Sequence, residues 1–205
     1  MAELNTNSRL EAFCDGVFAI ALTLLIIGIA IPSSETITTT HDLWLALQHL
    51  LPSVFAFLLS FIIIFISWVN HHGTLKLIDK SSPHFIYANG FLLLMIVIIP
   101  FPTSLLNQYL FTDLAAPAVV LYAVINVLLS IAWILLFQAA LKPNPLTKNE
   151  KASLIARASQ LNALWALAIY IICAILAFWF PQAVAFLLGA IWVFWLIYGI
   201  SVKAE

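Results

Sequence analysis

Charged residues are scarce in this chain. Lys, Arg, Asp and Glu together make up 8% of its 205 residues, whereas 64% are hydrophobic and the mean hydropathy is +1.09. A soluble domain carries about 25% charged residues, so this composition excludes one. The sequence predicts an integral membrane protein with a single domain over residues 1–205, surrounded by the lipid bilayer. It leaves no room for a soluble catalytic domain of ordinary size.

Signatures of enzymes and of bound cofactors are missing as well. The two cysteines, Cys14 and Cys173, lie in apolar segments and give no disulfide framework. His71 and His72 are adjacent, so on a helix they point about 100° apart and are poorly placed to share a metal ion. We find no nucleophile–base pattern and no glycine-rich phosphate loop. We therefore expect no enzyme activity, no cofactor, no resident metal and no nucleic-acid partner.

Six apolar runs are long enough to cross a bilayer, which takes about 20 helical residues. Their expected limits are Ser8–Ile31, Leu43–Asn70, His84–Leu106, Pro117–Leu141, Leu154–Phe180 and Ala183–Val202. The second run is long for a bilayer, so we expect it to tilt or to extend into the interface. The predicted fold is all-α, with six transmembrane helices.

Basic residues all fall on one side of this six-helix arrangement. The three loops on the other side contain no Lys or Arg, and the basic side holds Arg9, Lys76, Lys80, Lys142, Lys148, Lys151, Arg157 and Lys203. Lys and Arg mark the cytoplasmic side of a membrane protein. We therefore expect both termini to be cytoplasmic.

The first run carries charge only in its opening turns. Arg9, Glu11 and Asp15 precede an uncharged remainder. Ser8, followed three residues later by Glu11, predicts a capping box at the start of the helix. The acidic residues argue against the alternative of a cleaved signal peptide. Ionisable residues at the edge of a membrane span are costly, so these three suggest a function.

Helical spacing places a stripe of residues on one face of this run, at steps of three and four: Gly16, Ile20, Thr23, Leu24 and Ile27. Taken alone, the pattern favours a face that packs against a neighbouring helix, with Thr23 bonded back to its own helix. The periodicity establishes one face and does not identify what covers it.

The start of this run resembles the signature of a known family. Arg9-x-x-x-Phe13-Cys14-Asp15, followed by Gly-Val-Phe-Ala-Ile20, is similar to the motif Arg-x-x-x-Phe-Ser-Asp of the transmembrane protein 175 family, with Cys14 in place of the serine. That family consists of lysosomal and bacterial potassium channels, and the chain resembles its bacterial single-repeat type. The resemblance implies a homotetramer of six-helix subunits in a bacterial plasma membrane.

The resemblance also implies a pore lined by the first helix of each subunit. Ile20, Leu24 and Ile27 would form apolar constrictions that act as a hydrophobic gate, and Thr23 would add a ring of hydroxyls for selectivity. Potassium would pass transiently near Ile20 and Thr23 and would be conducted passively. A carbonyl selectivity filter is not expected, because the Tyr-Gly pair near the C-terminus lacks a preceding Thr-Val-Gly.

A polar group at the cytoplasmic end of the first helix completes the expected site. By resemblance, Arg9, Phe13 and Asp15 would brace that end, with Trp68 in the second run and His71, the first residue of the loop expected after it, as partners. Pattern alone leaves an interfacial belt of Trp and His as the alternative. It also leaves open whether His71 or its neighbour faces the motif.

One functional alternative belongs to another class. A proton-coupled transporter of a small solute could use Asp15 and His71 as a relay. Transporters usually place such coupling sites near the bilayer midplane. Because the midplane of this chain has almost no ionisable groups, we favour the channel.

Overall fold

The computed structural model describes residues 7–34, 37–142 and 144–202, and only the backbone of residues 198–202. These residues are almost entirely helical. The helices are α1 (Ser8–Leu24), the 3-10 turn η1 (Leu25–Gly28), α2 (Thr40–His49), α3 (Leu51–Leu77), α4 (Pro83–Ile98), α5 (Pro100–Tyr109), α6 (Ala115–Leu141), α7 (Glu150–Leu176) and α8 (Pro181–Val202).

The predicted all-α membrane fold is confirmed. Five segments are long and apolar enough to cross a bilayer: Ser8–Gly28, Leu51–Leu77, Pro83–Tyr109, Ala115–Leu141 and Glu150–Leu176. The apolar α8 corresponds to the sixth predicted run, but its fully described part, Pro181–Ile197, is shorter than these five segments.

The second predicted run is wrong at both ends. It is two helices, because the chain bends at Leu50 and α3 begins afresh with Pro52 in its first turn. Proline favours that position, where its missing N–H costs no hydrogen bond. At the other end α3 continues past Asn70 to Leu77, so that His71 and His72 are helical rather than part of a loop.

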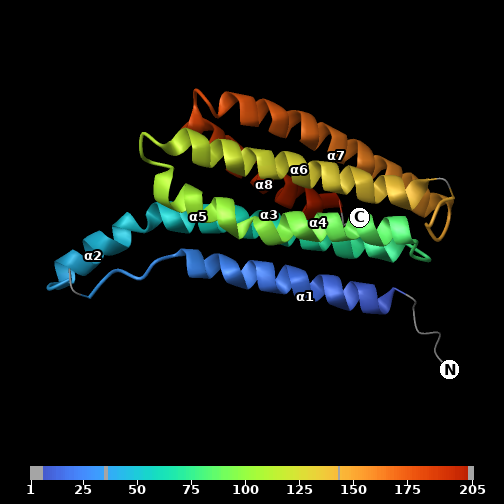
Figure 1. Cartoon of the computed structure of the whole chain (residues 1–205), viewed down its shortest axis with the longest axis horizontal. Helices are drawn as coiled ribbons and strands as arrows, with labels where there is room; N and C mark the ends of the chain where they lie inside the picture. Colours follow the sequence, from blue (N-terminus) through green and yellow to red (C-terminus); the bar gives the residue numbers. More distant parts are fainter. Residues whose placement is uncertain (1–6, 35–36, 143, 203–205) are drawn as a thin grey trace.

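The separate α2 helix buries no side chain and projects from one end of the bundle (Figure 1). Its start is fixed by a capping box, in which the Thr39 hydroxyl accepts a hydrogen bond from the backbone N–H of Asp42. The carboxylate of Asp42 accepts hydrogen bonds from Thr39 and Thr38. These bonds hold the pKa of Asp42 below its usual value.

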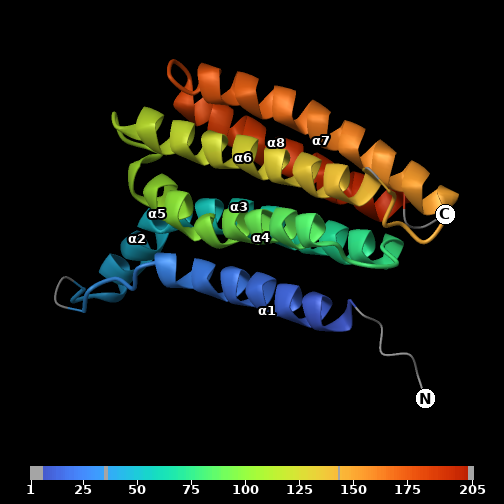
Figure 2. The ribbon, with the colours of Figure 1, turned by 45° about the vertical axis from the view of Figure 1, so that its right-hand side comes forward.

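The spans run side by side, with α1 along one edge of the bundle and α7 along the opposite edge (Figures 1 and 2). α1 packs against α3 and α4, and α6 lies between α4 and α7. The α8 helix packs against α3 and α6. A single subunit therefore covers only one side of α1.

One end of the bundle collects the described basic residues. The α3–α4 and α6–α7 connections meet there, where Asp79 N donates to Leu146 O at 2.8 Å and Lys148 N donates to Leu77 O at 2.9 Å. The start of α1 lies at the same end (Figure 1), and Ser81 Oγ donates to Asn7 Oδ1. Lys203 lies outside the described residues.

Candidate functional site

The buried side of α1 holds the helix in the subunit. Cys14, Phe18, Ala21 and Leu25 recur at steps of four, three and four, and all are almost fully buried. This spacing is one face of a helix. Residues on the other side are then turned away from the rest of the chain.

The opposite side of α1 is the open face, made of the predicted stripe and the residues above and below it. Ile20, Leu24 and Ile27 are 60%, 42% and 74% exposed, and Gly16 and Thr23 are exposed as well. Among the described residues, no helix of the same subunit covers these side chains. The packing interpretation therefore does not hold within one chain, and whatever covers the open face comes from outside the subunit.

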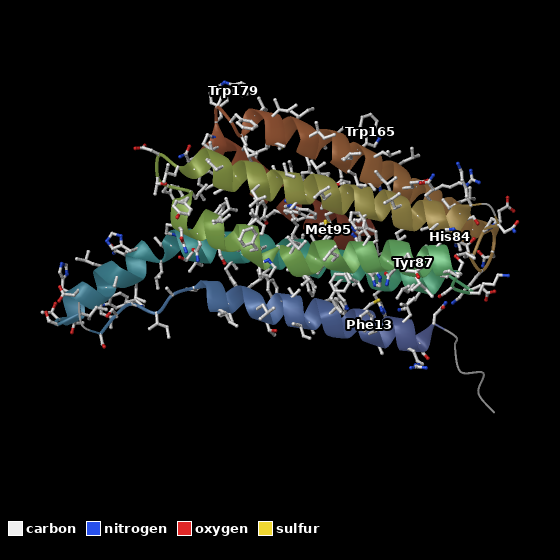
Figure 3. The ribbon with its side chains drawn as sticks, viewed as in Figure 1. Phe13, His84, Tyr87, Met95, Trp165 and Trp179 are labelled. Carbon is white, nitrogen blue, oxygen red and sulfur yellow. The ribbon has the colours of Figure 1, made fainter. Side chains whose placement is uncertain are left out.

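Arg9 and Phe13 extend the open face toward the basic end. Both are exposed, and Figure 3 shows Phe13 on α1. Within the described residues neither side chain makes a hydrogen bond or an ion pair. In a single subunit they are therefore not bonded to the neighbouring helices as the expected brace would require.

Thr23 is bonded to its own helix. Its Oγ1 donates to the carbonyl oxygen of Ile20 at 2.9 Å. This is the back-bonding expected from the pattern. Because the hydroxyl hydrogen is committed to Ile20, the oxygen lone pairs remain on the open face as acceptors.

The far end of α1 narrows into the 3-10 turn η1, which carries Ile27. Leu25 anchors this turn in the core, and Asn107 Nδ2 donates to the carbonyl oxygen of Gly28 at 2.6 Å. A Cβ on Gly28 would lie 3.4 Å from Ser104 Oγ, so α5 fits closely against the turn. α5 therefore fixes the position from which Ile27 projects.

Asp15 is joined to the second span as expected. Trp68 Nε1 donates to Asp15 Oδ1 at 2.8 Å. The indole ring also contacts the rings of Phe65 and His72, at centroid distances of 5.8 and 6.1 Å. α3 thus holds the carboxylate of Asp15 through an indole that is itself fixed by neighbouring rings.

The predicted capping box at the start of α1 is wrong. α1 begins after Asn7 with no side-chain cap, and Ser8 is already its first residue. The carboxylate of Glu11 is instead engaged by α3, where His72 Nδ1 lies 3.0 Å from Glu11 Oε1. The contact is at ion-pair distance without the alignment of a hydrogen bond.

His71 lies on the inner side of α3 and is fully buried. Its Nε2 donates to Asn89 Oδ1 at 2.7 Å, and Asn89 Nδ2 donates to Cys14 Sγ at 3.2 Å. The ring also packs on Phe18, at a centroid distance of 5.4 Å. Both histidines therefore reach α1, His72 directly through Glu11 and His71 through Phe18 and the amide of Asn89.

Asn89 is the residue that sequence reasoning missed. It appears in the sequence as one of several scattered polar residues of the spans, which inter-helix hydrogen bonds explain. Its position two turns into α4 places it, almost fully buried, between the motif cysteine and His71. Within the described part of the chain, no group of three or more His, Cys, Asp or Glu residues is arranged to hold a metal ion.

Comparison with known proteins places this arrangement in a family. Residues 9–100 match the model described as endosomal/lysosomal potassium channel TMEM175. A crystal structure of a lysosomal potassium-selective channel TMEM175 homolog from Chamaesiphon minutus superposes with a TM-score of 0.78 and 34% identity, over 92% of this chain and 96% of that one. The chain belongs to the TMEM175 family. This is a family of channels rather than of enzymes.

Two curated relatives of this chain are described as potassium channels. A potassium channel of Chamaesiphon minutus is 42% identical over 131 residues, which are 64% of this chain and 64% of that protein. A potassium channel of Streptomyces collinus is 37% identical over 131 residues, 63% of this chain and 62% of the relative. The matched stretch thus spans slightly less than two thirds of each relative.

Proposed function

We propose that this protein is a potassium-selective channel, formed by four copies whose α1 helices surround a central pore. Conduction is passive and requires no cofactor. The channel lies in a bacterial plasma membrane, with the basic end of each subunit and both termini in the cytoplasm. Two observations support potassium as the conducted ion and a channel as the type of transporter. The chain belongs to the TMEM175 family, and its relatives are named potassium channels.

The observation that carries the proposal is the open face of α1. One helix supplies only one wall of a pore, so a channel built on this face needs several copies around an axis. The face is apolar in the middle of the span and uncovered along its length, while the other side of α1 is packed into the subunit. Assembly of four subunits would turn four such faces toward one axis.

Ile20, Leu24 and Ile27 form the constrictions of this pore. They lie on successive turns of the open face. A narrow ring of aliphatic side chains expels water, and an ion cannot pass until the ring widens and becomes wet. These three rings therefore act as a hydrophobic gate.

Thr23 supplies the polar ring between these constrictions. Its hydroxyl hydrogen is used by the Ile20 carbonyl, so four copies offer oxygen lone pairs to the axis. Potassium sheds water more readily than sodium does, and a ring of oxygen acceptors replaces part of the lost hydration. Selectivity then arises near Ile20 and Thr23 without backbone carbonyl rings of the usual filter.

Polar contacts at the basic end brace the pore helix. Asp15 is held by Trp68, and His71 is linked to Cys14 through Asn89. Arg9 and Phe13, which are uncovered in one subunit, complete the brace by contacting a neighbouring copy. These contacts keep the orientation of α1 constant while its apolar rings open and close.

The transporter alternative receives less support. A relay through Asp15 and His71 requires the two groups to exchange a proton. In the described residues Asp15 is bonded to Trp68 and His71 to Asn89, and no hydrogen bond or ion pair joins the two. Neither group lines either of the two cavities found at the basic end of the bundle.

Reversal potentials test the proposal. The purified protein would be reconstituted in planar bilayers with high potassium and low sodium on one side and low potassium and high sodium on the other. A channel gives discrete current steps that reverse close to the potassium equilibrium potential. Currents that require a proton gradient, or transport without steps, would contradict it.

A further inference from the structure

Two neighbouring cavities at the basic end of the bundle share one residue, Arg157. The smaller one, of about 110 Å³, is lined by Gln138, Leu141, Lys142, Arg157 and Gln160. The larger one, of about 470 Å³, is lined by Pro145, Thr147, Asn149, Glu150, Ser153, Leu154 and Arg157. Arg157 lies about two turns into α7 and lines both cavities.

The smaller cavity holds two positive charges without a protein counterion. Within the described residues, neither Arg157 nor Lys142 has an ion-pair partner, and both are exposed. Glu150, the nearby acid, lines the larger cavity and not the smaller one. Two cations side by side repel one another, so a bound anion would stabilise the arrangement.

The other polar groups of the smaller cavity suit a phosphate. Gln138 and Gln160, which carry amide N–H donors, line the same cavity as Arg157 and Lys142. A guanidinium binds phosphate oxygens through two parallel hydrogen bonds, and an ammonium acts as a point charge. Gln160 Nε2 is only weakly engaged, at 3.5 Å from the Ile134 carbonyl oxygen, so it is available to turn toward a ligand.

The apolar surface beside the cavity favours a phosphate that is carried by a lipid over a free phosphate. From Arg157 onward α7 exposes a row of apolar side chains, Leu161, Leu164 and Trp165. Trp165 lies on the edge of the bundle opposite Phe13 (Figure 3). α7 therefore faces the lipid when α1 faces the pore. An acyl chain can follow this row while its headgroup stays at the interface.

We infer that the cavity of Gln138, Lys142, Arg157 and Gln160 binds the phosphate of an anionic phospholipid from the cytoplasmic leaflet. Basic pockets between spans on the cytoplasmic side are suited to anionic headgroups. The site is independent of the pore, because none of its residues belongs to α1. It would tie the α6–α7 connection to the membrane surface.

Lipid titration of the full-length protein in detergent tests this inference. Thermal unfolding would be followed while phosphatidylglycerol, phosphatidylcholine or glycerol phosphate is added. We expect phosphatidylglycerol to raise the melting temperature more than phosphatidylcholine does, and glycerol phosphate to have no effect. In Lys142→Gln or Arg157→Gln the apparent affinity for phosphatidylglycerol should fall by about fivefold. Arg157→Lys, which keeps the charge, should retain part of it.

The matched control is Lys80→Gln, which removes an exposed base at the same end but outside both cavities. It should bind phosphatidylglycerol like the wild type. An equal loss of affinity for phosphatidylglycerol in all three glutamine variants would overturn the inference. It would show that the anionic lipid is attracted to the whole basic end and not bound in the cavity. Equal stabilisation by glycerol phosphate would overturn it too, since the site would then take a free phosphate. None of these measurements depends on conduction, so they stand apart from the channel test.

Discussion

Asn89 donates a hydrogen bond to the sulfur of Cys14, across 3.2 Å, while its carbonyl oxygen accepts one from His71 at 2.7 Å. One amide in α4 thus joins the motif helix α1 to α3. The motif that this sequence resembles, Arg-x-x-x-Phe-Ser-Asp, has a serine at this position, and a serine side chain offers a hydroxyl oxygen as acceptor. Sulfur is a weaker acceptor, but the amide keeps this contact with cysteine in place.

The first prediction concerns the buried amide. Asn89→Leu would leave His71 Nε2 fully buried without a partner, and Nδ1 already has none. The free energy of unfolding should fall by about 1–3 kcal/mol. Thermal unfolding of the purified protein measures this.

The matched control is Asn126→Leu, a buried asparagine whose amide bonds only to the Tyr122 carbonyl of its own helix. Asn126→Leu should lower the free energy of unfolding by less than Asn89→Leu does. If the two variants lose equal stability, the hydrogen bonds of Asn89 to α1 and α3 stabilise the fold no more than the bond of Asn126 within its own helix does.

The second prediction concerns the indole that holds Asp15. Trp68→Phe keeps an aromatic ring beside Phe65 and His72 but removes the N–H donor. We expect a loss of about 1.5 kcal/mol, the low end for a hydrogen bond to a charged group, because the contact is only partly buried. Asp15→Asn, which keeps an acceptor oxygen, should lose less. A Trp68→Phe variant as stable as the wild type, by the same unfolding assay, would show that the ring alone holds the end of α1.

The sequence was sufficient for the fold class, for five of the six predicted spans and for the side that collects the bases, because these depend on long apolar runs and on charge. It was also sufficient for the stripe that places Ile20, Thr23 and Leu24 on one face of α1, since helical spacing alone sets that face. What covers the open face could not be predicted. Lipid, a partner helix and a dry pore all accept aliphatic side chains.

The polar details were not predictable, because each depends on a choice between competing partners. Glu11 could cap its own helix or pair with His72, and tertiary packing favours the second. Pro52 lies in the first turn of α3, but whether a helix kinks or restarts at a proline depends on the packing around it. His71 reads as a loop residue until Asn89 provides a buried partner.

The third prediction concerns topology. Single cysteines at Ser34 and Asn149 lie at opposite ends of the bundle and should be labelled from opposite sides of intact cells. The native Cys14 and Cys173 are buried and should give little background. Impermeant maleimide labelling measures this. If both positions react from outside, the cytoplasmic assignment of the basic end is wrong.

The fourth prediction concerns the end of α1 that continues into η1. Asn107→Leu removes the hydrogen bond to the Gly28 carbonyl and frees the turn that carries Ile27. We expect a loss of about 1 kcal/mol in stability and a change in the open fraction of single-channel records. Gln108→Leu is the control, because the neighbouring side chain is exposed. Identical records for the two variants would exclude a positioning role for Asn107.

The central claim, that the open face of α1 lines the pore, is tested most directly by placing a polar side chain on it. Ile20→Asn should wet the constriction, raise the basal current and move the reversal potential toward zero in asymmetric potassium and sodium. Leu22→Asn, on the packed side of α1, and Leu161→Asn, equally exposed but on α7, should keep the wild-type reversal potential. If Ile20→Asn reverses at the same potential and passes the same current as these two controls, α1 does not line the pore.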